Sequence, residues 1–209
     1  MSSKKKKERI ATWNLWGKIL VACVPAAIIG ILFDDWLTAH LHNSTIVSLM
    51  LIIYGIAFIV IESKGLGKQT TEDLNKITYK QALGVGAFQL LSLIPGTSRS
   101  GSTIIGGLFL GLKRSVAAEF TFFLAIPVMV GASLLKALKY VLEVMESPAV
   151  MFNTNEIVML IVACLVAFIV SVLVIKFLMN YIRKHDFKVF GYYRIILGIL
   201  VIAYFLFMS

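Results

Sequence analysis

The sequence is poor in charge, in proline and in cysteine. Of its 209 residues, 15% are charged, four are proline and two are cysteine. A typical soluble domain carries about 25% charged residues, so this chain has too little polar surface for an ordinary soluble fold or a disordered segment. The two cysteines, Cys23 and Cys164, stand alone in apolar runs, and they predict neither a metal site nor a disulfide framework.

Apolar side chains are what the chain has in excess. Hydrophobic residues make up 59% of it, and its mean hydropathy is +0.89. The formal net charge of +9 is compatible with nucleic-acid binding, but no basic face interleaved with aromatic residues accompanies it. Lysine and arginine also collect in the cytoplasmic loops of membrane proteins. We therefore predict a membrane protein that has lipids as partners and binds no nucleic acid.

Five apolar runs are candidate transmembrane helices, which need about 17–25 residues each. They cover residues 18–33, 46–61, 116–135, 157–177 and 192–208. The first two are short and need flanking interfacial residues, and the third contains Glu119 and Pro127. This pattern predicts an all-α fold, a polytopic integral membrane helical bundle that forms a single membrane domain over residues 1–209.

The charges between these runs predict the orientation. With the N-terminus inside, cytoplasmic segments hold 17 of the 20 basic residues, including those of the basic tail 1–17. The 17 are Lys4, Lys5, Lys6, Lys7, Arg9, Lys18, Lys64, Lys68, Lys76, Lys80, Lys113, Arg114, Lys176, Arg183, Lys184, Lys188 and Arg194. Segment 34–44 has two Asp residues and no Lys or Arg, as expected of an outside loop. We predict a multi-pass protein whose N-terminus is cytoplasmic.

A broken apolar stretch covers residues 82–112. Its apolar residues are interrupted by the polar segment 95–102, and basic residues flank both arms. Each arm is too short to cross, because thirteen helical residues rise about 20 Å against about 30 Å of hydrocarbon. Irregular backbone at this depth is tolerated only where it is buried in protein or lines a wet cavity. The pattern predicts a re-entrant hairpin whose tip lies inside the membrane and forms a binding site.

The residues of the predicted tip suit an anion. Gly96 and Gly101 free the backbone to turn, and Arg99 offers a planar, permanently charged fork for phosphate oxygens. The hydroxyl donors of the tip are Ser98, Ser100, Ser102 and Thr103. A second arm that starts near Ser102 or Thr103 would add a helix N-terminus. The alternative is a polar surface loop between two interfacial helices, with Arg99 reaching to the interface.

Two further polar residues each allow two interpretations. Glu119 either pairs with Arg99 and orients it, or is the N-terminal acid of its helix beside Lys113 and Arg114. Gln89 either hydrogen-bonds across the hairpin or simply joins neighbouring helices.

The segment from Pro95 to Thr103 reads Pro-Gly-Thr-Ser-Arg-Ser-Gly-Ser-Thr, and it resembles the signature of the undecaprenyl-diphosphatase family. These are integral-membrane bacitracin-resistance phosphatases. Further matches are Gln89, Ala117-Ala118-Glu119-Phe120, Ala125-Ile126-Pro127, Tyr193-Arg194 and the early stretch 18–34 with Pro25. The resemblance covers nearly the whole chain.

The resemblance implies that the protein removes the terminal phosphate of undecaprenyl diphosphate in the bacterial plasma membrane. This reaction recycles the lipid carrier of cell-wall synthesis and gives bacitracin resistance. The implied fold is a helical membrane bundle with two inverted repeats, each contributing a re-entrant hairpin. The implied partner is a polyprenyl diphosphate lipid, and a homodimer is left open.

The same resemblance implies roles for the residues of the hairpin. Arg99 would grip the diphosphate, and Ser98, Ser100 and Thr103 would share its catalytic pocket. The implied substrate-binding residues are Gly96, Thr97, Gly101, Ser102, Gln89 and Glu119. A divalent cation, Mg²⁺ or Ca²⁺, is expected from the family, but its ligands are not visible in this chain.

One departure from the family pattern affects the expected activity. Family members begin with an earlier hairpin that carries a Glu-rich motif and a Pro-x-Ser-Ser-x-Gly-His stretch, and we expect this first catalytic section to be missing here. No acidic residue replaces it, because Glu62, Glu72, Asp73, Glu143 and Glu146 all lie outside the apolar hairpin. Three hypotheses stay open: a phosphatase or the large C-terminal part of one, a non-enzymatic lipid-diphosphate binder or transporter, and an inactive fragment.

Overall fold

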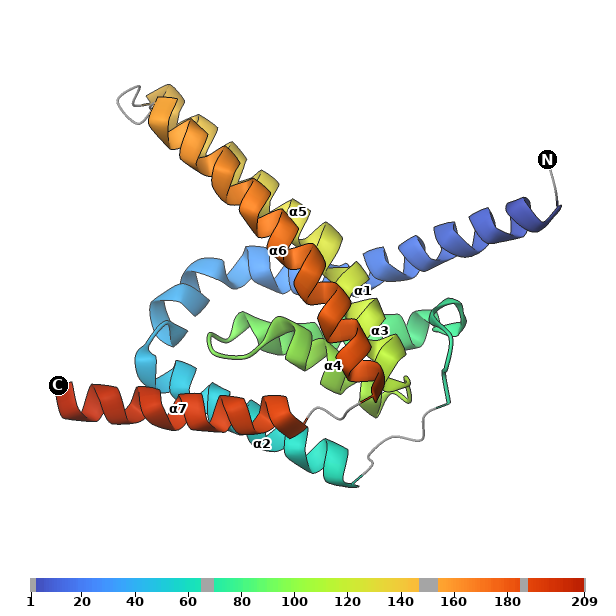
Figure 1. Cartoon of the computed structure of the whole chain (residues 1–209). Coiled ribbons are helices and arrows are strands. Elements are labelled where there is room, and N and C mark those ends of the chain that lie inside the picture. Colours follow the sequence, from blue (N-terminus) through green and yellow to red (C-terminus); the bar gives the residue numbers. More distant parts are fainter. Residues whose placement is uncertain (1–2, 65–69, 147–153, 185–187, 209) are drawn as a thin grey trace.

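The computed structural model describes residues 3–64, 70–146, 154–184 and 188–208 (Figure 1). Within these ranges the regular elements are helices, and the only β pairing is an isolated bridge between Thr71 and Leu112. The prediction of an all-α fold is confirmed.

Five helices of the described chain are long and apolar enough to cross a membrane, which confirms the five predicted spans. They are α1 (Ser3–Leu41), α2 (Ser44–Lys64), α5 (Arg114–Glu146), α6 (Thr154–Lys184) and α7 (Lys188–Met208). The predicted outside loop 34–44 is wrong in extent, because α1 continues through it as far as Leu41. The two chain ends lie on opposite sides of the molecule (Figure 1).

The stretch between α2 and α5 forms the predicted helix–break–helix hairpin. Its elements are η1 (Leu74–Lys76), α3 (Tyr79–Gln89), η2 (Leu90–Leu93) and α4 (Arg99–Phe109). Thr78 starts α3 with a capping box, since its hydroxyl accepts from the Gln81 backbone while the Gln81 side chain accepts from the Thr78 backbone. The 11 residues of α3 rise about 16 Å and η2 adds about 8 Å, so this arm ends short of a 30 Å crossing.

A polar strap closes the base of the hairpin. The backbone N–H of Lys113 donates to the carbonyl of Thr71 at 2.9 Å, next to the Thr71–Leu112 bridge. The Gln81 amide donates to the Thr71 hydroxyl and to the Leu110 carbonyl, both at 3.0 Å. These bonds join the start of α3, the end of α4 and the segment before η1. The two arms therefore leave the base at a defined separation.

The hairpin packs against α1 on one side and against α5 on the other. Gly86 of α3 lies directly on the backbone of α1, where a Cβ would collide with the carbonyl of Ala22. The buried core at this junction joins α1, α3 and the start of α5: Leu15, Ile19, Ala22, Ile77, Ala82, Val85, Leu112, Val116, Ala117, Phe120 and Leu124. Small residues thus let the re-entrant arm approach a spanning helix closely.

Helices α2 and α7 form a second tight pair beside the hairpin (Figure 1). A Cβ added to Gly55 of α2 would lie 2.7 Å from the carbonyl oxygen of Gly191 on α7, so the two backbones touch. The α5 and α6 helices run together away from this body (Figure 1). The apolar side chains of α6 between residues 157 and 177 are exposed in the chain and are suited to contact lipid.

Candidate anion-binding site

The break between the two arms of the hairpin is a compact turn at residues 94–98. Gly96 has a φ of +88°, a left-handed conformation that side chains with a Cβ rarely adopt. The Thr97 hydroxyl donates to the carbonyls of Leu91 at 2.8 Å and Ile94 at 2.6 Å. Thr97 therefore closes the turn, and its hydroxyl faces the preceding backbone.

The N-terminus of α4 lies at the tip of the hairpin. The helix begins at Arg99, so the expectation of a start near Ser102 or Thr103 is wrong by three to four residues. The reason is Ser98, an N-cap whose hydroxyl accepts from the Gly101 N–H at 3.1 Å and also bonds the Ser100 hydroxyl at 3.1 Å. The N–H groups of Arg99 and Ser100 precede any intrahelical acceptor and carry the positive end of the helix dipole.

Arg99 occupies the first position of this helix and is only partly exposed. Its charge is close enough to Cys23 of α1 to interact electrostatically with the thiol. Among the residues that the structure describes, no acidic side chain pairs with Arg99. A guanidinium at a helix N-terminus places two sources of positive potential at the same point.

A second arginine reaches the tip from α7. One terminal nitrogen of Arg194, Nη2, donates to the carbonyl of Gly96 at 2.6 Å, and its guanidinium carbon lies 5.9 Å from the ring centroid of Tyr54. Its Nε is buried and has no hydrogen-bond partner in the described chain. Arg194, predicted among the cytoplasmic residues, lies within α7, six residues after its start at Lys188. Two features of the sequence indicate this placement: Arg194 lies inside an apolar run, and Tyr193-Arg194 matches the family pattern.

Two of the predicted site hydroxyls are buried in helix packing. Ser102 is fully buried, and its hydroxyl donates to the Tyr54 hydroxyl at 3.0 Å. Thr103 donates to the Arg99 carbonyl at 3.0 Å and accepts from Thr121 of α5 at 2.9 Å. Gly101 is also buried, next to the ring of Phe58. These three residues hold the first turn of α4 between α2 and α5.

Gln89 ends α3 and is 1% exposed. Neither its amide nitrogen nor its amide oxygen has a hydrogen-bond partner in the described part of the chain. The structure therefore contains no bond from Gln89 across the hairpin. Its buried face, shared with Val85 and Gly86, is the one that packs within the bundle.

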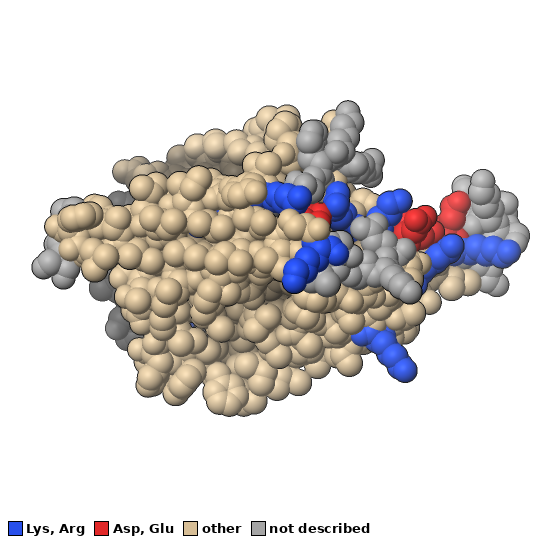
Figure 2. Space-filling model, turned by 90° about the horizontal axis from the view of Figure 1, so that it is seen from below, with Lys and Arg blue, Asp and Glu red and all other residues tan. Residues whose placement is uncertain are grey.

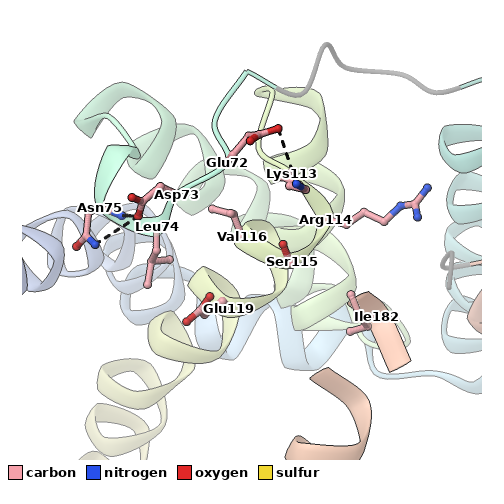
Figure 3. A pocket seen from close by; sticks show the side chains of 10 residues that line it. All are labelled: Glu72, Asp73, Leu74, Asn75, Lys113, Arg114, Ser115, Val116, Glu119 and Ile182. Carbon is pink, nitrogen blue, oxygen red and sulfur yellow. Dashed lines mark hydrogen bonds and ion pairs between the residues drawn. The ribbon is translucent and has the colours of Figure 1, made fainter. Parts of the chain in front are cut away.

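Glu119 lies on the far side of α5 from the hairpin tip. Thr121 of α5 faces α4, because its hydroxyl donates to Thr103. Glu119 lies two residues earlier, so its side chain points about 200° around the helix axis from Thr121. Glu119 lines instead a pocket of about 890 Å³ with Asp73, Lys113 and Arg114 (Figure 3). This geometry favours the interpretation of Glu119 as an acid near the start of its helix.

The charged residues near the tip do not fit a divalent cation. In the described ranges, no group of three or more His, Cys, Asp or Glu residues is placed to hold a metal ion. The groups at the tip are Arg99 at the N-terminus of α4, Arg194 on the Gly96 carbonyl, hydroxyls and backbone N–H groups, and guanidinium charges repel a cation. The arrangement suits a multiply charged anion with several oxygen acceptors.

The fold defines a polytopic, all-helical membrane protein with a re-entrant hairpin whose tip carries Arg99 at a helix N-terminus. A model of the bacitracin resistance protein BacA family matches residues 1–200. The chain belongs to this family.

Three relatives illustrate the similarity, and each is named undecaprenyl-diphosphatase. The chain is 58% identical over 192 residues to one from Enterococcus faecalis, an alignment that covers 91% of this chain and 67% of the relative. It is 55% identical over 196 residues to one from Desulfitobacterium hafniense, covering 93% and 68%. It is 52% identical over 203 residues to one from Streptococcus thermophilus, covering 96% and 68%.

Proposed function

We propose that this protein hydrolyses undecaprenyl diphosphate to undecaprenyl phosphate and inorganic phosphate. The reaction would return the lipid carrier to cell-wall synthesis and give resistance to bacitracin. The observation that carries the proposal is a hairpin tip inside an apolar bundle, where Arg99 begins α4 and Arg194 of α7 donates to the carbonyl of Gly96. The names of the relatives support the same substrate.

The described residues account for binding and charge neutralisation. Hydrolysis of a diphosphate adds water to the terminal phosphorus and breaks its bond to the bridging oxygen, which leaves on the lipid phosphate. Negative charge shifts toward the bridging and terminal oxygens during this step. Arg99 offers two parallel donors to these oxygens, and the free N–H groups of Arg99 and Ser100 add two more. Ser100, which is exposed at the tip, and Ser98 complete the donor set.

A second candidate function is non-enzymatic binding or transport of a lipid diphosphate. It is favoured by one observation: in the described ranges Arg99 has no acidic ion-pair partner, and no group of three or more His, Cys, Asp or Glu residues is placed to hold a metal ion. A divalent cation and a homodimer both remain predictions. We derive no step through a metal from the described residues, because their donor set does not fit one.

We propose that the N-terminus is cytoplasmic and that the head group enters from the opposite side. On the face in Figure 2, Lys and Arg side chains gather toward one end of the molecule, and the described residues at the other end of this face are uncharged. The tip points away from the hairpin base, since Gly96 lies against Val47, near the start of α2 at Ser44. The tip therefore opens in the half of the membrane opposite to the basic end.

The test is phosphate release by the purified full chain in detergent with undecaprenyl diphosphate, in the presence of a divalent cation or of EDTA. Binding of inorganic pyrophosphate is measured by calorimetry in the same samples. Phosphate release that is lost in Arg99→Ala supports the phosphatase. Pyrophosphate binding that Arg99→Ala abolishes, without any phosphate release, favours the binder. Reporter fusions to both termini test the orientation.

A further inference from the structure

Tyr54 of α2 makes polar contacts with two separate parts of the anion site. Its side chain is 8% exposed, and its hydroxyl accepts the hydroxyl proton of Ser102 at 3.0 Å. Its ring lies under the guanidinium of Arg194 at 5.9 Å from centroid to Cζ. Arg194 in turn donates to the carbonyl of Gly96. A continuous chain of contacts thus runs from α4 through α2 and α7 to the turn of the hairpin.

These contacts connect the α2–α7 pair to the hairpin, beside the packing of Gly96 on Val47 and the ion pair between Glu62 of α2 and Arg114 of α5. Helix α2 packs along the length of α7, with the backbones in contact at Gly55 and Gly191, whereas α2 meets α4 only locally. The local contact contains Tyr54 and Phe58, both buried. Phe58 is apolar and touches Gly101, so it supplies packing without fixing a direction. The hydroxyl of Tyr54 supplies the directional contact at this junction.

Apolar packing alone does not explain a tyrosine at this position. A phenylalanine fills the same space, and a buried tyrosine hydroxyl must regain the hydrogen bonds that it loses on leaving water. Here the Tyr54 hydroxyl accepts a hydrogen bond from Ser102 of α4, which lies four positions after the N-cap Ser98. The face of the Tyr54 ring contacts Arg194. In the described chain, Arg194 is the only α7 side chain that hydrogen-bonds to the hairpin turn.

We propose that Tyr54 is a positioning residue for the anion site. It sets the α2–α7 pair against the hairpin so that Arg194 stays on the Gly96 carbonyl of the turn that precedes Arg99. The proposal rests on the proposed function for the identity of the anion, a lipid diphosphate. It does not place Tyr54 in contact with the substrate, and its effect passes through Ser102 and Arg194.

The experiment separates the two contacts of Tyr54 in purified full-length variants. Tyr54→Phe removes the hydroxyl and keeps the ring, Ser102→Ala removes the same hydrogen bond from its other end, and Tyr54→Leu removes both contacts. Each variant is assayed for KM and kcat with undecaprenyl diphosphate and for pyrophosphate affinity by calorimetry. Thermal unfolding in detergent shows which variants remain folded. Tyr204→Phe is the matched control, because Tyr204 is 57% exposed near the end of α7.

We expect Tyr54→Phe and Ser102→Ala each to weaken pyrophosphate binding about fivefold, the effect of one lost hydrogen bond. Their double variant should be no worse than either alone, because both changes remove the same bond. Tyr54→Leu should weaken binding about 30-fold, since it also removes the contact with Arg194. In an Arg194→Ala background, Tyr54→Leu should then cost no more than Tyr54→Phe. Tyr204→Phe should match the unchanged protein.

Wild-type affinity in Tyr54→Phe, or additive losses in the double variant, overturns the proposal. If Tyr54→Leu does not fold, the hydroxyl pair still decides the outcome. Failure of the proposed function is seen separately, as absent phosphate release with intact pyrophosphate binding, and the affinity series then still tests Tyr54. Absence of pyrophosphate binding in the unchanged protein overturns both proposals.

Discussion

The guanidinium of Arg194 donates to the carbonyl of Gly96 at 2.6 Å, across 98 positions of sequence. This bond brings the last spanning helix to the turn of the re-entrant hairpin. It also places a second positive charge beside the N-terminus that begins at Arg99. Hydrogen bonds to charged groups contribute about 1.5–3 kcal/mol, so the contact both fixes the turn and builds the site.

Replacing Arg99 by lysine should reduce phosphate release severely, by about 100-fold in kcat/KM, the usual effect of losing one oriented donor to a developing negative charge. Lysine keeps the charge but not the two parallel donors. The assay is steady-state phosphate release from undecaprenyl diphosphate. Arg9→Lys, on the exposed N-terminal part of α1, is the matched control and should be unchanged. Full activity in Arg99→Lys would rule out the two-pronged contact.

Replacing Arg194 by alanine should loosen the hairpin turn as well as weaken anion binding. We expect a loss of about 2 kcal/mol in the free energy of unfolding, because the charged bond to Gly96 disappears. Pyrophosphate affinity should fall in the same variant. Thermal unfolding in detergent and calorimetry measure the two effects. The neighbouring Tyr193→Phe, on a side chain that is 63% exposed, should leave both unchanged. An unchanged free energy of unfolding in Arg194→Ala would contradict the proposal that the bond to Gly96 stabilises the turn.

Replacing Gly96 by alanine should destabilise the protein more than any other glycine-to-alanine change in α4 or the turn. The left-handed φ of +88° costs about 1–2 kcal/mol for a residue with a Cβ, and the new methyl group would also meet the carbonyl of Val47. The contrasting variant is Gly131→Ala in α5, where nothing lies within 4 Å of the added carbon. It should stabilise its helix by up to about 1 kcal/mol. Equal unfolding temperatures for the two variants would refute the assigned turn geometry.

The ion pair between Arg114 and Glu62 should matter more than the neighbouring pair between Lys113 and Glu72. The first has a distance of 2.7 Å and a Glu62 side chain that is 4% exposed, whereas the second has 3.7 Å and a Glu72 side chain that is 71% exposed. Glu62→Gln removes the charge of a buried carboxylate and leaves the partly exposed Arg114 guanidinium without its partner, and we expect a loss of about 1 kcal/mol after discounting for solvent screening of Arg114. Glu72→Gln should change stability by less than about 0.5 kcal/mol. Chemical unfolding of both variants in the same detergent makes the comparison, and a larger loss in Glu72→Gln would reverse this order.

The hairpin was predictable because its signals are local. Apolar runs report helices that can enter lipid, and the glycine, proline and serine residues at 95–102 report where such a helix must break. Even the error at the start of α4 has a local cause. Ser98 caps the helix that begins at Arg99, and serine is a common N-cap residue. The prediction instead assigned Ser98 to the turn.

The residues predicted for the site lie in two different environments. Arg99, Ser98, Ser100, Gly96 and Thr97 do lie at the tip, but the hydroxyls of Ser102 and Thr103 face Tyr54 and Thr121. Which side of α4 faces the site depends on the helices that pack against it. Helix α2 precedes α4 in sequence by about 50 positions, and no local pattern encodes that contact.

The sequence by itself determined that the chain spans a membrane, that a short helical hairpin enters it without crossing, and that an arginine lies at the hairpin tip. These features follow from hydropathy, length and the cost of charge in lipid, which are properties of single segments. Only the tertiary structure decided that Arg194 hydrogen-bonds the turn of the hairpin and that Glu119 faces away from that turn. It also decided that Tyr54 connects the two halves. Such contacts arise when helices far apart in sequence pack side by side, and the register of that packing sets which side chains meet.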